Sequence, residues 1–261
     1  MFVDIGANLT HDDFSRDLDL VIERATTAGV TKIMVTGSSL ESSREALNLA
    51  RKYPEYLFST AGIHPHHAED TSQSVMAQLT LLLGNTEVKA VGETGLDFFR
   101  DLSPRETQIS SFESHIALAI EHKLPMFLHE RDAYPCFAEI LSTYRDDLSE
   151  VVVHCFTGEK EALHHYIDLD CHIGITGWIC DERRGEHLLE LVGDIPADRL
   201  MIETDSPYLL PRTIRPRPKS RRNEPSFLGY VCDTIARVTE KSPLEVAAQT
   251  SKNAESFFRL C

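Results

Sequence analysis

Residues that can bind a metal or transfer a proton follow short apolar runs at several places in the chain. The motifs are GETGLD with Glu93, FLHERD with His129, VVHCFTG with His154, IETDSPY with Asp205 and GIHPH with His64. A buried carboxylate is costly unless it is paired or bound to a metal. Imidazole and carboxylate groups together bind divalent cations. These residue types therefore predict a metal site, provided that the fold brings the motifs together.

The chemistry expected of such a site is hydrolysis. Glu93 can bind or bridge metal ions through its carboxylate, while His129 and His154 supply nitrogens that favour Mn, Zn or Fe over Mg. Asp205 is expected both to bind metal and to orient or deprotonate the metal-bound water. His64 or His66 can donate to a phosphate or protonate a leaving oxygen, and His64 is favoured. Because each residue alone more often has a structural role, the prediction depends on the whole set.

Eight apolar runs are predicted to be the strands that carry these motifs. They are Phe2–Ile5, Lys32–Thr36, Leu57–Ala61, Val88–Gly92, Met126–His129, Val151–His154, His172–Ile175 and Leu200–Glu203. Their near-continuous apolar character is typical of parallel strands that are covered on both faces. Alternation along the last strand is expected to turn Glu203 away from the site, which gives it a structural role.

Segments with helical spacing separate the strands. Ser103-Pro104-Arg105-Glu106 predicts a helix start with a capping box, and Gly29 and Gly84 stand where helices should stop. Two more helices are predicted over 227–238 and 244–258. Strand–helix alternation repeated eight times predicts a closed (β/α)8 TIM barrel rather than an open doubly wound sheet. The carboxyl ends of all strands would then share one face, where the motifs converge.

Length and composition indicate a protein with one domain that stays inside the cell. At 261 residues, the chain is near the length of a typical TIM barrel, so one domain is expected over residues 1–261. No apolar stretch approaches the roughly 18 residues of a membrane helix, and no secretory signal is recognised at the start. The six cysteines form no Cys-x-x-Cys pair and are expected to be free thiols. We therefore expect a cytoplasmic monomer.

The charge distribution is uneven. A formal net charge of -15 argues against a protein that coats nucleic acid, because phosphates would be repelled almost everywhere. One segment, RTIRPRPKSRR over 212–222, has six basic residues and no acid. It is either a solvated loop stiffened by prolines or a rim that binds an anion. Of the arginines near strand ends and in rim loops, Arg131 and Arg222 are the favoured phosphate contacts.

The motifs resemble those of the TatD family of metal-dependent deoxyribonucleases, within the amidohydrolase-like TIM barrels. The matching segments are GIHPH (62–66), GETGLD (92–97), HERD (129–132), HCFTG (154–158), GITGW (174–178) and ETDSPYLLP (203–211). The resemblance covers essentially the whole chain. It implies a 3′-5′ exonuclease that depends on a divalent ion, with Mg²⁺ expected and Mn²⁺ or Zn²⁺ as alternatives. Single-stranded DNA, and RNA besides, are the implied substrates, with a role in repair of oxidative DNA damage.

The first strand departs from the family pattern. Most members begin with Asp-x-His-x-His, whose histidines complete a second metal position, whereas this chain has Asp4-Ile5-Gly6-Ala7-Asn8. Gly6 and Asn8 occupy alternate positions and are both expected to face the pocket. Neither is a good metal ligand. One tightly held ion is therefore expected, and a second Mg²⁺ would arrive with the substrate phosphate.

Two other functions stay open at this point. A metal hydrolase on the same barrel can cleave an ester or amide, such as the bond that joins a D-amino acid to tRNA. The basic segment over 212–222 suits tRNA as well as a single strand. A non-catalytic protein that binds nucleic acid or metal is the second alternative. Retention of Glu93, His129, His154 and Asp205 argues against it.

Overall fold

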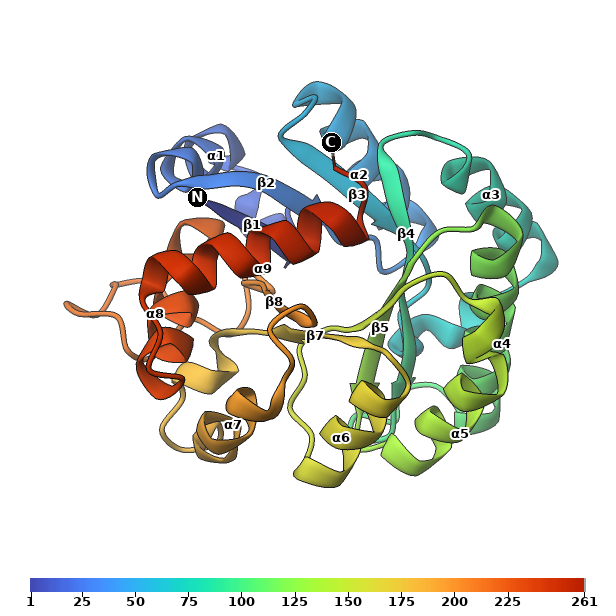
Figure 1. Cartoon of the computed structure of the whole chain (residues 1–261). Helices are drawn as coiled ribbons and strands as arrows, with labels where there is room; N and C mark the ends of the chain where they lie inside the picture. The colour runs from blue at the N-terminus through green and yellow to red at the C-terminus, as the bar shows by residue number, and fades with distance from the viewer. Residues whose placement is uncertain (261) are drawn as a thin grey trace.

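A computed structural model describes residues 1–260 and contains a barrel of eight parallel strands (Figure 1). The strands are β1 (Phe2–Ala7), β2 (Val30–Val35), β3 (Leu57–Ala61), β4 (Val88–Asp97), β5 (Met126–Arg131), β6 (Val151–Val153), β7 (His172–Ile175) and β8 (Leu200–Ile202). They pair in chain order. A parallel bridge between Ala7 and Ser206 connects the first strand to the segment after the last. The predicted (β/α)8 fold is confirmed.

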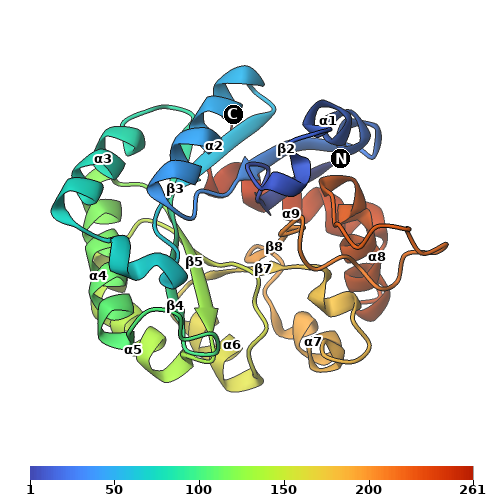
Figure 2. The same cartoon turned by 180° about the vertical axis from the view of Figure 1, so that it is seen from behind.

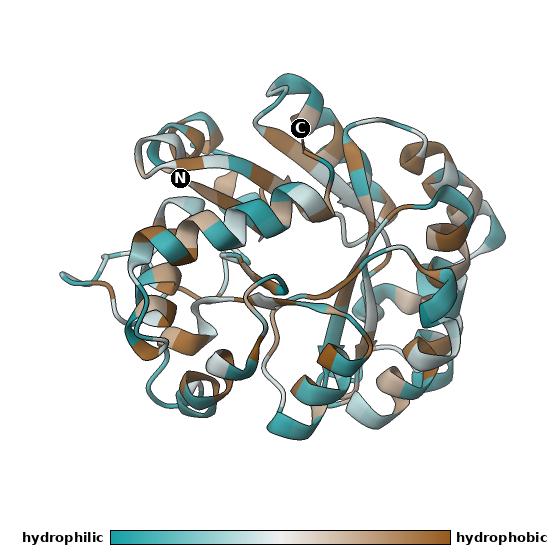
Figure 3. Ribbon diagram, viewed as in Figure 1, coloured by the Kyte–Doolittle hydropathy of each residue, from teal (hydrophilic) through white to brown (hydrophobic). Residues whose placement is uncertain are grey.

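Helices surround the strands in the order of the chain (Figure 1). They are α1 (Leu18–Thr27), α2 (Leu40–Lys52), α3 (Gln73–Leu83), α4 (Arg105–His122), α5 (Tyr134–Tyr144), α6 (Lys160–Asp168), α7 (Glu186–Leu191), α8 (Leu228–Val238) and α9 (Pro243–Phe257). Brown and teal residues alternate along the helix ribbons in Figure 3, as expected for helices with one face on the sheet and the other in water.

The apolar core has two parts. The larger part fills the layer between the strands and the outer helices. The smaller part lies inside the barrel, where Val3, Phe127 and Met201 meet Phe257 and Phe258 from the last helical segment. Helix α9 crosses in front of the strands in Figure 1 and lies behind them in Figure 2. It therefore closes the amino-terminal end of the barrel and leaves the carboxyl end for the polar motifs.

Strand β4 is longer than predicted and contains the GETGLD motif. It runs to Asp97 rather than stopping at Gly92, because the motif pairs with β5, with Gly95 opposite His129 and Asp97 opposite Arg131. Gly95 has a φ of 141°, and a Cβ there would lie 1.9 Å from the His129 carbonyl oxygen. Only glycine permits this close approach. Glu93 consequently lies within a strand instead of after one.

Two predicted helix ends are correct, and one helix begins within its predicted segment but without the predicted capping box. Gly84 is the C-cap of α3, and Gly29, with a φ of 85°, follows the end of α1. Helix α4 begins at Arg105 without a side-chain cap. The Ser103 hydroxyl donates instead to the carbonyl of His66, at 3.1 Å. A partner distant in the sequence thus replaces the expected capping box.

Candidate metal centre

Three imidazoles meet one carboxylate oxygen at the carboxyl end of the barrel. Glu93 Oε1 lies 2.8 Å from His154 Nε2, 3.2 Å from His129 Nδ1 and 3.3 Å from His64 Nε2. The four side chains come from β4, from β5 and from the segments that follow β6 and β3. Glu93 is 6% exposed, and its partners are imidazoles rather than Lys or Arg. The structure therefore brings together residues that are far apart in the sequence.

Carboxylates lie behind two of the three imidazoles. The outer nitrogen of His154, Nδ1, is 3.3 Å from Glu203 Oε2. The outer nitrogen of His129, Nε2, is 3.5 Å from Asp97 Oδ2. A carboxylate on the outer nitrogen attracts the imidazole proton to that side and leaves a lone pair on the inner nitrogen. His129 and His154 thus both direct the nitrogen that can bind a metal towards Glu93.

His64 has the opposite arrangement. Its Nδ1 accepts the backbone N–H of His66 at 3.1 Å, so the neutral imidazole carries its proton on Nε2, the nitrogen nearest Glu93. Burial lowers the pKa of His64 to about 4, which keeps the ring neutral. His64 is one of three residues, with Glu93 and His129, whose donor atoms lie within 4.8 Å of one another. Its tautomer nevertheless makes it a hydrogen-bond donor rather than a ligand.

The charges of the cluster depend on one another. Burial alone would raise the pKa of Glu93, but the imidazoles of His64, His154 and His129 hold it well below its ordinary value. Burial alone would lower the pKa of His154, yet the carboxylates of Glu203 and Glu93 raise it well above its ordinary value. The cluster is therefore a set of mutually dependent acids and bases in a buried place, which is typical of a functional site.

Asp205 lies in the same cavity, next to Asn8. The cavity measures about 250 Å³ and is lined by Asn8, Ser38, His64, His66, His67, Glu93, His129, His154, Cys155, Asp205 and Tyr208. The Asn8 amide donates to Asp205 Oδ1 at 3.0 Å. Burial raises the pKa of Asp205 to about 7, with an opposing effect from His154. All five predicted metal-site and proton-transfer residues thus line one cavity.

The expected orientation of Glu203 is wrong. Strand β8 ends at Ile202, and positions two apart share a side in any case, so alternation gave no reason to separate Glu203 from Asp205. Glu203 is fully buried and contacts His154. Its Oε1 accepts the backbone N–H of Cys155 at 2.6 Å. Glu203 therefore fixes the segment that carries His154.

The first strand closes the position where the family pattern has histidines. A Cβ on Gly6 would lie 2.3 Å from Glu203 Oε2 and 3.1 Å from a Phe127 ring carbon. Gly6 thus faces the Glu203 carboxylate and is absent from the cavity lining, so the expectation that it faces the open pocket is wrong. Asp4 accepts hydrogen bonds from the backbone and hydroxyl of Thr204, at 2.9 and 2.6 Å. Of Asp4, Gly6 and Asn8, only Asn8 lines the cavity.

The two favoured arginines have different surroundings. Arg131 donates to the Thr157 hydroxyl at 2.9 Å, and its Nε is buried without a hydrogen-bond partner. Arg222 donates to both carboxylate oxygens of Asp17, at 2.7 and 2.8 Å, and to Glu224 at 2.7 Å. These bonds commit Arg222 to carboxylates, so it gains no support as a phosphate contact.

The sequence predictions missed Asp97 and preferred His64 to His66 as the donor to the substrate. Asp97 Oδ2 accepts a hydrogen bond from His66 Nε2 at 2.6 Å and also faces His129. Backbone N–H groups of Phe99 and Arg100 donate to its other oxygen, at 3.0 and 2.8 Å. The acid of the GETGLD motif was the available signal. Its role depended on β4 continuing through the motif.

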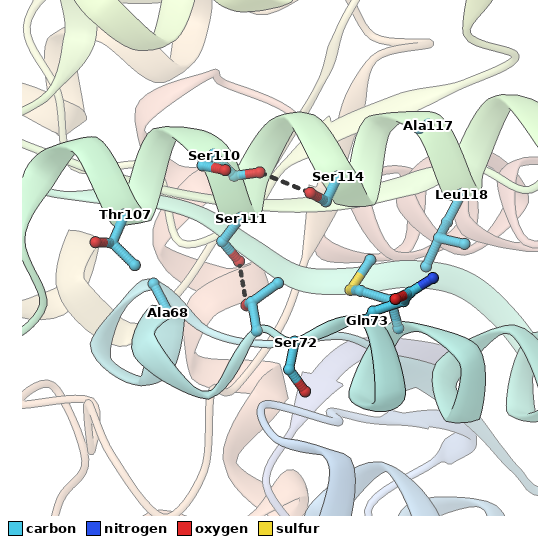
Figure 4. A pocket seen from close by; sticks show the side chains of 11 residues that line it. Ala68, Ser72, Gln73, Thr107, Ser110, Ser111, Ser114, Ala117 and Leu118 are labelled. Carbon is cyan, nitrogen blue, oxygen red and sulfur yellow. Dashed lines mark hydrogen bonds between the residues drawn. The ribbon is translucent and has the colours of Figure 1, made fainter.

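A second hollow lies on the outside of the barrel, between α3 and α4 (Figure 4). It measures about 430 Å³ and is lined by Ala68, Thr71, Ser72, Gln73, Met76, Thr107, Ser110, Ser111, Ser114, Ala117 and Leu118. The hydroxyls of Thr71 and Ser111 lie 2.8 Å apart. No lining side chain is ionisable in the physiological range or a strong metal ligand. This hollow is larger than the cavity at the metal centre but lacks the histidines and carboxylates found there.

The fold and the buried cluster of histidines and carboxylates define a TIM-barrel hydrolase. The sequence profile of the family described as TatD related DNase matches residues 3–259, and the chain belongs to this family. Membership makes it a nuclease, a hydrolase of phosphodiester bonds, as predicted. The ester- or amide-cleaving alternative is not favoured by any of these similarities.

Similar proteins support the assignment along the whole chain. A protein of Erwinia tasmaniensis named 3′-5′ ssDNA/RNA exonuclease TatD is 49% identical over 257 residues, which cover 98% of this chain and 99% of that protein. A protein of Erwinia amylovora with the same name is 48% identical, with coverage of 98% and 99%. The crystal structure of a TatD family hydrolase from Entamoeba histolytica has a TM-score of 0.90 at 27% identity and covers 100% of this chain and 98% of that one. The crystal structure of a TatD homologue from Escherichia coli K12 has a TM-score of 0.90 at 28% identity and covers 99% of this chain and 98% of that one.

Two properties bear on the expected cellular setting. Within residues 1–260, no helix is both long and apolar enough to span a membrane. The five cysteines in the same range, Cys136, Cys155, Cys171, Cys180 and Cys232, are free thiols, and Cys261 lies outside the described residues. The prediction of unpaired cysteines therefore holds for these five.

Proposed function

We propose that this nuclease removes nucleotides from the 3′ end of single-stranded DNA and RNA, with a divalent ion held by Glu93, His129 and His154. The observation that carries the proposal is the orientation of the two histidines. In both, one ring nitrogen lies beside Glu93 and a buried carboxylate lies beside the other nitrogen, so a divalent ion can replace the proton on the inner nitrogen. The names of relatives at 48 to 49% identity support the substrates and the polarity.

The donor set fits one tightly bound ion. Two imidazole nitrogens and a carboxylate suit Mn²⁺ or Zn²⁺ at the Glu93 position. The Asp205 side offers oxygen donors, which suit Mg²⁺, the ion expected from the family resemblance. Because Glu203 fills the space beside Gly6, that side lacks further protein ligands, and we assign part of the coordination there to the substrate phosphate. Metal analysis of the substrate-free protein should find one tight ion per chain; two would contradict the assignment.

The side chains divide the work of hydrolysis. When bound, the divalent ion supplies positive charge that polarises the phosphate and favours deprotonation of water. Asp205, which the Asn8 amide holds in place, accepts the proton of the attacking water. His64, which is neutral, carries its proton on Nε2 and donates a hydrogen bond from that nitrogen to a phosphate oxygen of the substrate. Arg131 contacts a substrate phosphate with the donors that it does not use on Thr157.

We place the enzyme in the cytoplasm, as a monomer with one domain over residues 1–261. The free cysteines within residues 1–260 support a reducing compartment. A role in repair of oxidative DNA damage is supported by the family resemblance. The enzyme would then remove damaged or frayed single strands from a 3′ end.

A strand-shortening assay tests the function. Single strands of DNA and RNA with a 5′ label, and a duplex of the same sequence, are incubated with Mg²⁺ or Mn²⁺ and with EDTA. We expect a ladder that shortens from the 3′ end on single strands and disappears with EDTA. The His154→Ala variant should be inactive, whereas His164→Ala, which changes an exposed histidine on α6, should be as active as the wild type. Release of a D-amino acid from tRNA without strand shortening would favour the alternative hydrolase.

A further inference from the structure

Four side chains beside the metal centre form a stack of alternating rings and guanidinium groups. The Arg131 Cζ lies 4.9 Å from the centre of the Phe99 ring and 4.7 Å from the Trp178 ring. The Arg184 Cζ lies 4.2 Å from the same Trp178 ring. We call Phe99, Arg131, Trp178 and Arg184 the rim stack. A guanidinium at these distances is attracted by the ring faces.

The rim stack is attached to the segments that carry the metal centre. Phe99 follows Asp97 by two residues, and Arg131 follows His129 by two. Asp97 and Arg131 are partners in the register of β4 and β5. Arg131 also donates to Thr157, three residues after His154. The stack therefore continues from the catalytic cavity over the carboxyl ends of the neighbouring strands.

The outer member of the stack is exposed without a structural reason. Phe99 is 57% exposed, although burial of a large aromatic side chain stabilises a folded protein. The Arg100 Cζ lies 5.9 Å from the same ring. Arg100 forms no ion pair with any residue of 1–260. In a chain with a net charge of -15, an open ring beside the guanidinium of Arg100, unpaired within residues 1–260, points to an anionic ligand with flat groups.

We propose that the rim stack is a platform on which bases of the single strand stack while the neighbouring phosphates lie against Arg100 and Arg131; this inference rests on the proposed nuclease function. Stacking on an aromatic face accepts every base, which suits a nuclease that must digest any sequence. It also requires an unpaired base, because the faces of bases inside a duplex are already covered. The platform thus supplies selectivity for single strands outside the metal centre.

Binding can be measured without cleavage, because Trp178 is the only tryptophan in the chain and reports on the stack through its fluorescence. The protein in EDTA is titrated with a single-stranded DNA oligomer, and the loss of Trp178 emission gives Kd. We expect Phe99→Ala and Phe99→Leu to weaken binding on the order of tenfold, because both lack a ring. Phe99→Tyr keeps the ring and should bind like the wild type. Leu81→Ala, at an exposed apolar residue on α3, is the matched control and should not change Kd.

Oligomers that lack bases decide whether stacking is the cause. With a strand of abasic sugars, Phe99→Ala should bind no more weakly than the wild-type protein, because such a strand has no base that could stack on the Phe99 ring. An equal loss with normal and abasic strands, or no quenching by single strands at millimolar concentration, would overturn the platform. Strand shortening tests the enzyme separately. If the protein binds strands in a base-dependent way but does not shorten them, only the nuclease proposal is contradicted. If the protein shortens strands but its binding does not depend on Phe99, only the platform is contradicted.

Discussion

The two ends of the barrel are built from the same strands, and each end contains a buried histidine. At the carboxyl end, His154 lies between the carboxylates of Glu93 and Glu203, which raise its pKa well above the ordinary value despite its burial. At the amino end, His172 packs edge-on against Phe257, with ring centres 5.0 Å apart. Burial lowers the pKa of His172 to about 4. Burial is therefore common to both histidines, and the partners of each ring decide its chemistry.

The same contrast extends to the neighbouring acids. Glu203 and Asp97 at the open end are buried and directed at histidines. At the closed end, Glu150 lies 3.8 Å from His172, and its side chain is 44% exposed. An exposed carboxylate is screened by water and fixes an imidazole only weakly. The difference indicates that a metal site requires acids held in place behind the histidines, and not only histidines near one another.

The largest effect should separate the two histidines. His154→Ala removes a proposed ligand, so divalent metal affinity should fall at least about tenfold and most hydrolysis should be lost. The corresponding change at the closed end, His172→Ala, should leave metal affinity and the turnover of folded protein unchanged. Calorimetric titration with Mn²⁺ and the strand-shortening assay measure both. Equal metal affinity in the two variants would remove the distinction between the ends.

The next effect concerns proton transfer at the open end. Asp205→Asn should reduce kcat by at least about 10²-fold, because the amide cannot accept the proton of the attacking water. The fold should persist, since the Asn8 side chain can still donate to the amide oxygen at that position. Asp198→Asn, in an exposed place near the closed end, is the control with normal kcat. Near-normal turnover of the Asp205 variant would make this residue structural.

A smaller effect is expected from the acid behind His154. Glu203→Gln should weaken metal binding by about 10- to 100-fold, because the neutral amide no longer holds the imidazole proton on the outer nitrogen. Gly6→Ala should act in the same direction, since its Cβ would press on the Glu203 carboxylate. The pH dependence of metal binding should shift in the Glu203 variant, whereas a purely structural loss would leave it unchanged.

The closed end should affect stability and leave catalysis unchanged. Phe257→Ala removes a buried ring that packs on His172 and on the barrel interior. Such a change typically costs about 3–5 kcal/mol of unfolding free energy. Metal affinity and kcat per folded molecule should stay at wild-type values. Denaturant unfolding together with titration of the folded protein checks both, and a metal defect here would show that the two ends are coupled.

The convergence of Glu93, His129 and His154 could be predicted because all strands of a parallel barrel end on one face. That rule needs only the order of strands and motifs, which is visible in the sequence. The cavity lining confirms this part. Likewise, the barrel itself followed from eight alternations of strand and helix.

The errors concern contacts between distant segments. Nothing near Arg222 in the sequence shows that Asp17 will accept its two hydrogen bonds, and Ser103 gives no sign of its bond to His66. Glu203 was misjudged because a rule for strands was applied past the end of β8. Side-chain partners chosen by tertiary packing override local patterns, and a single sequence does not show them.

Helix α9 also has a consequence for the order in which the protein is made. It follows all eight strands in the chain, so the ribosome delivers every strand before the helix whose Phe257 lies against the barrel interior. Until α9 arrives, Val3 and Phe127 inside the barrel are open to water and to other chains. Such surfaces promote aggregation during synthesis. The nascent enzyme is therefore expected to be most vulnerable, and most in need of a chaperone, after β8 and before α9 has docked.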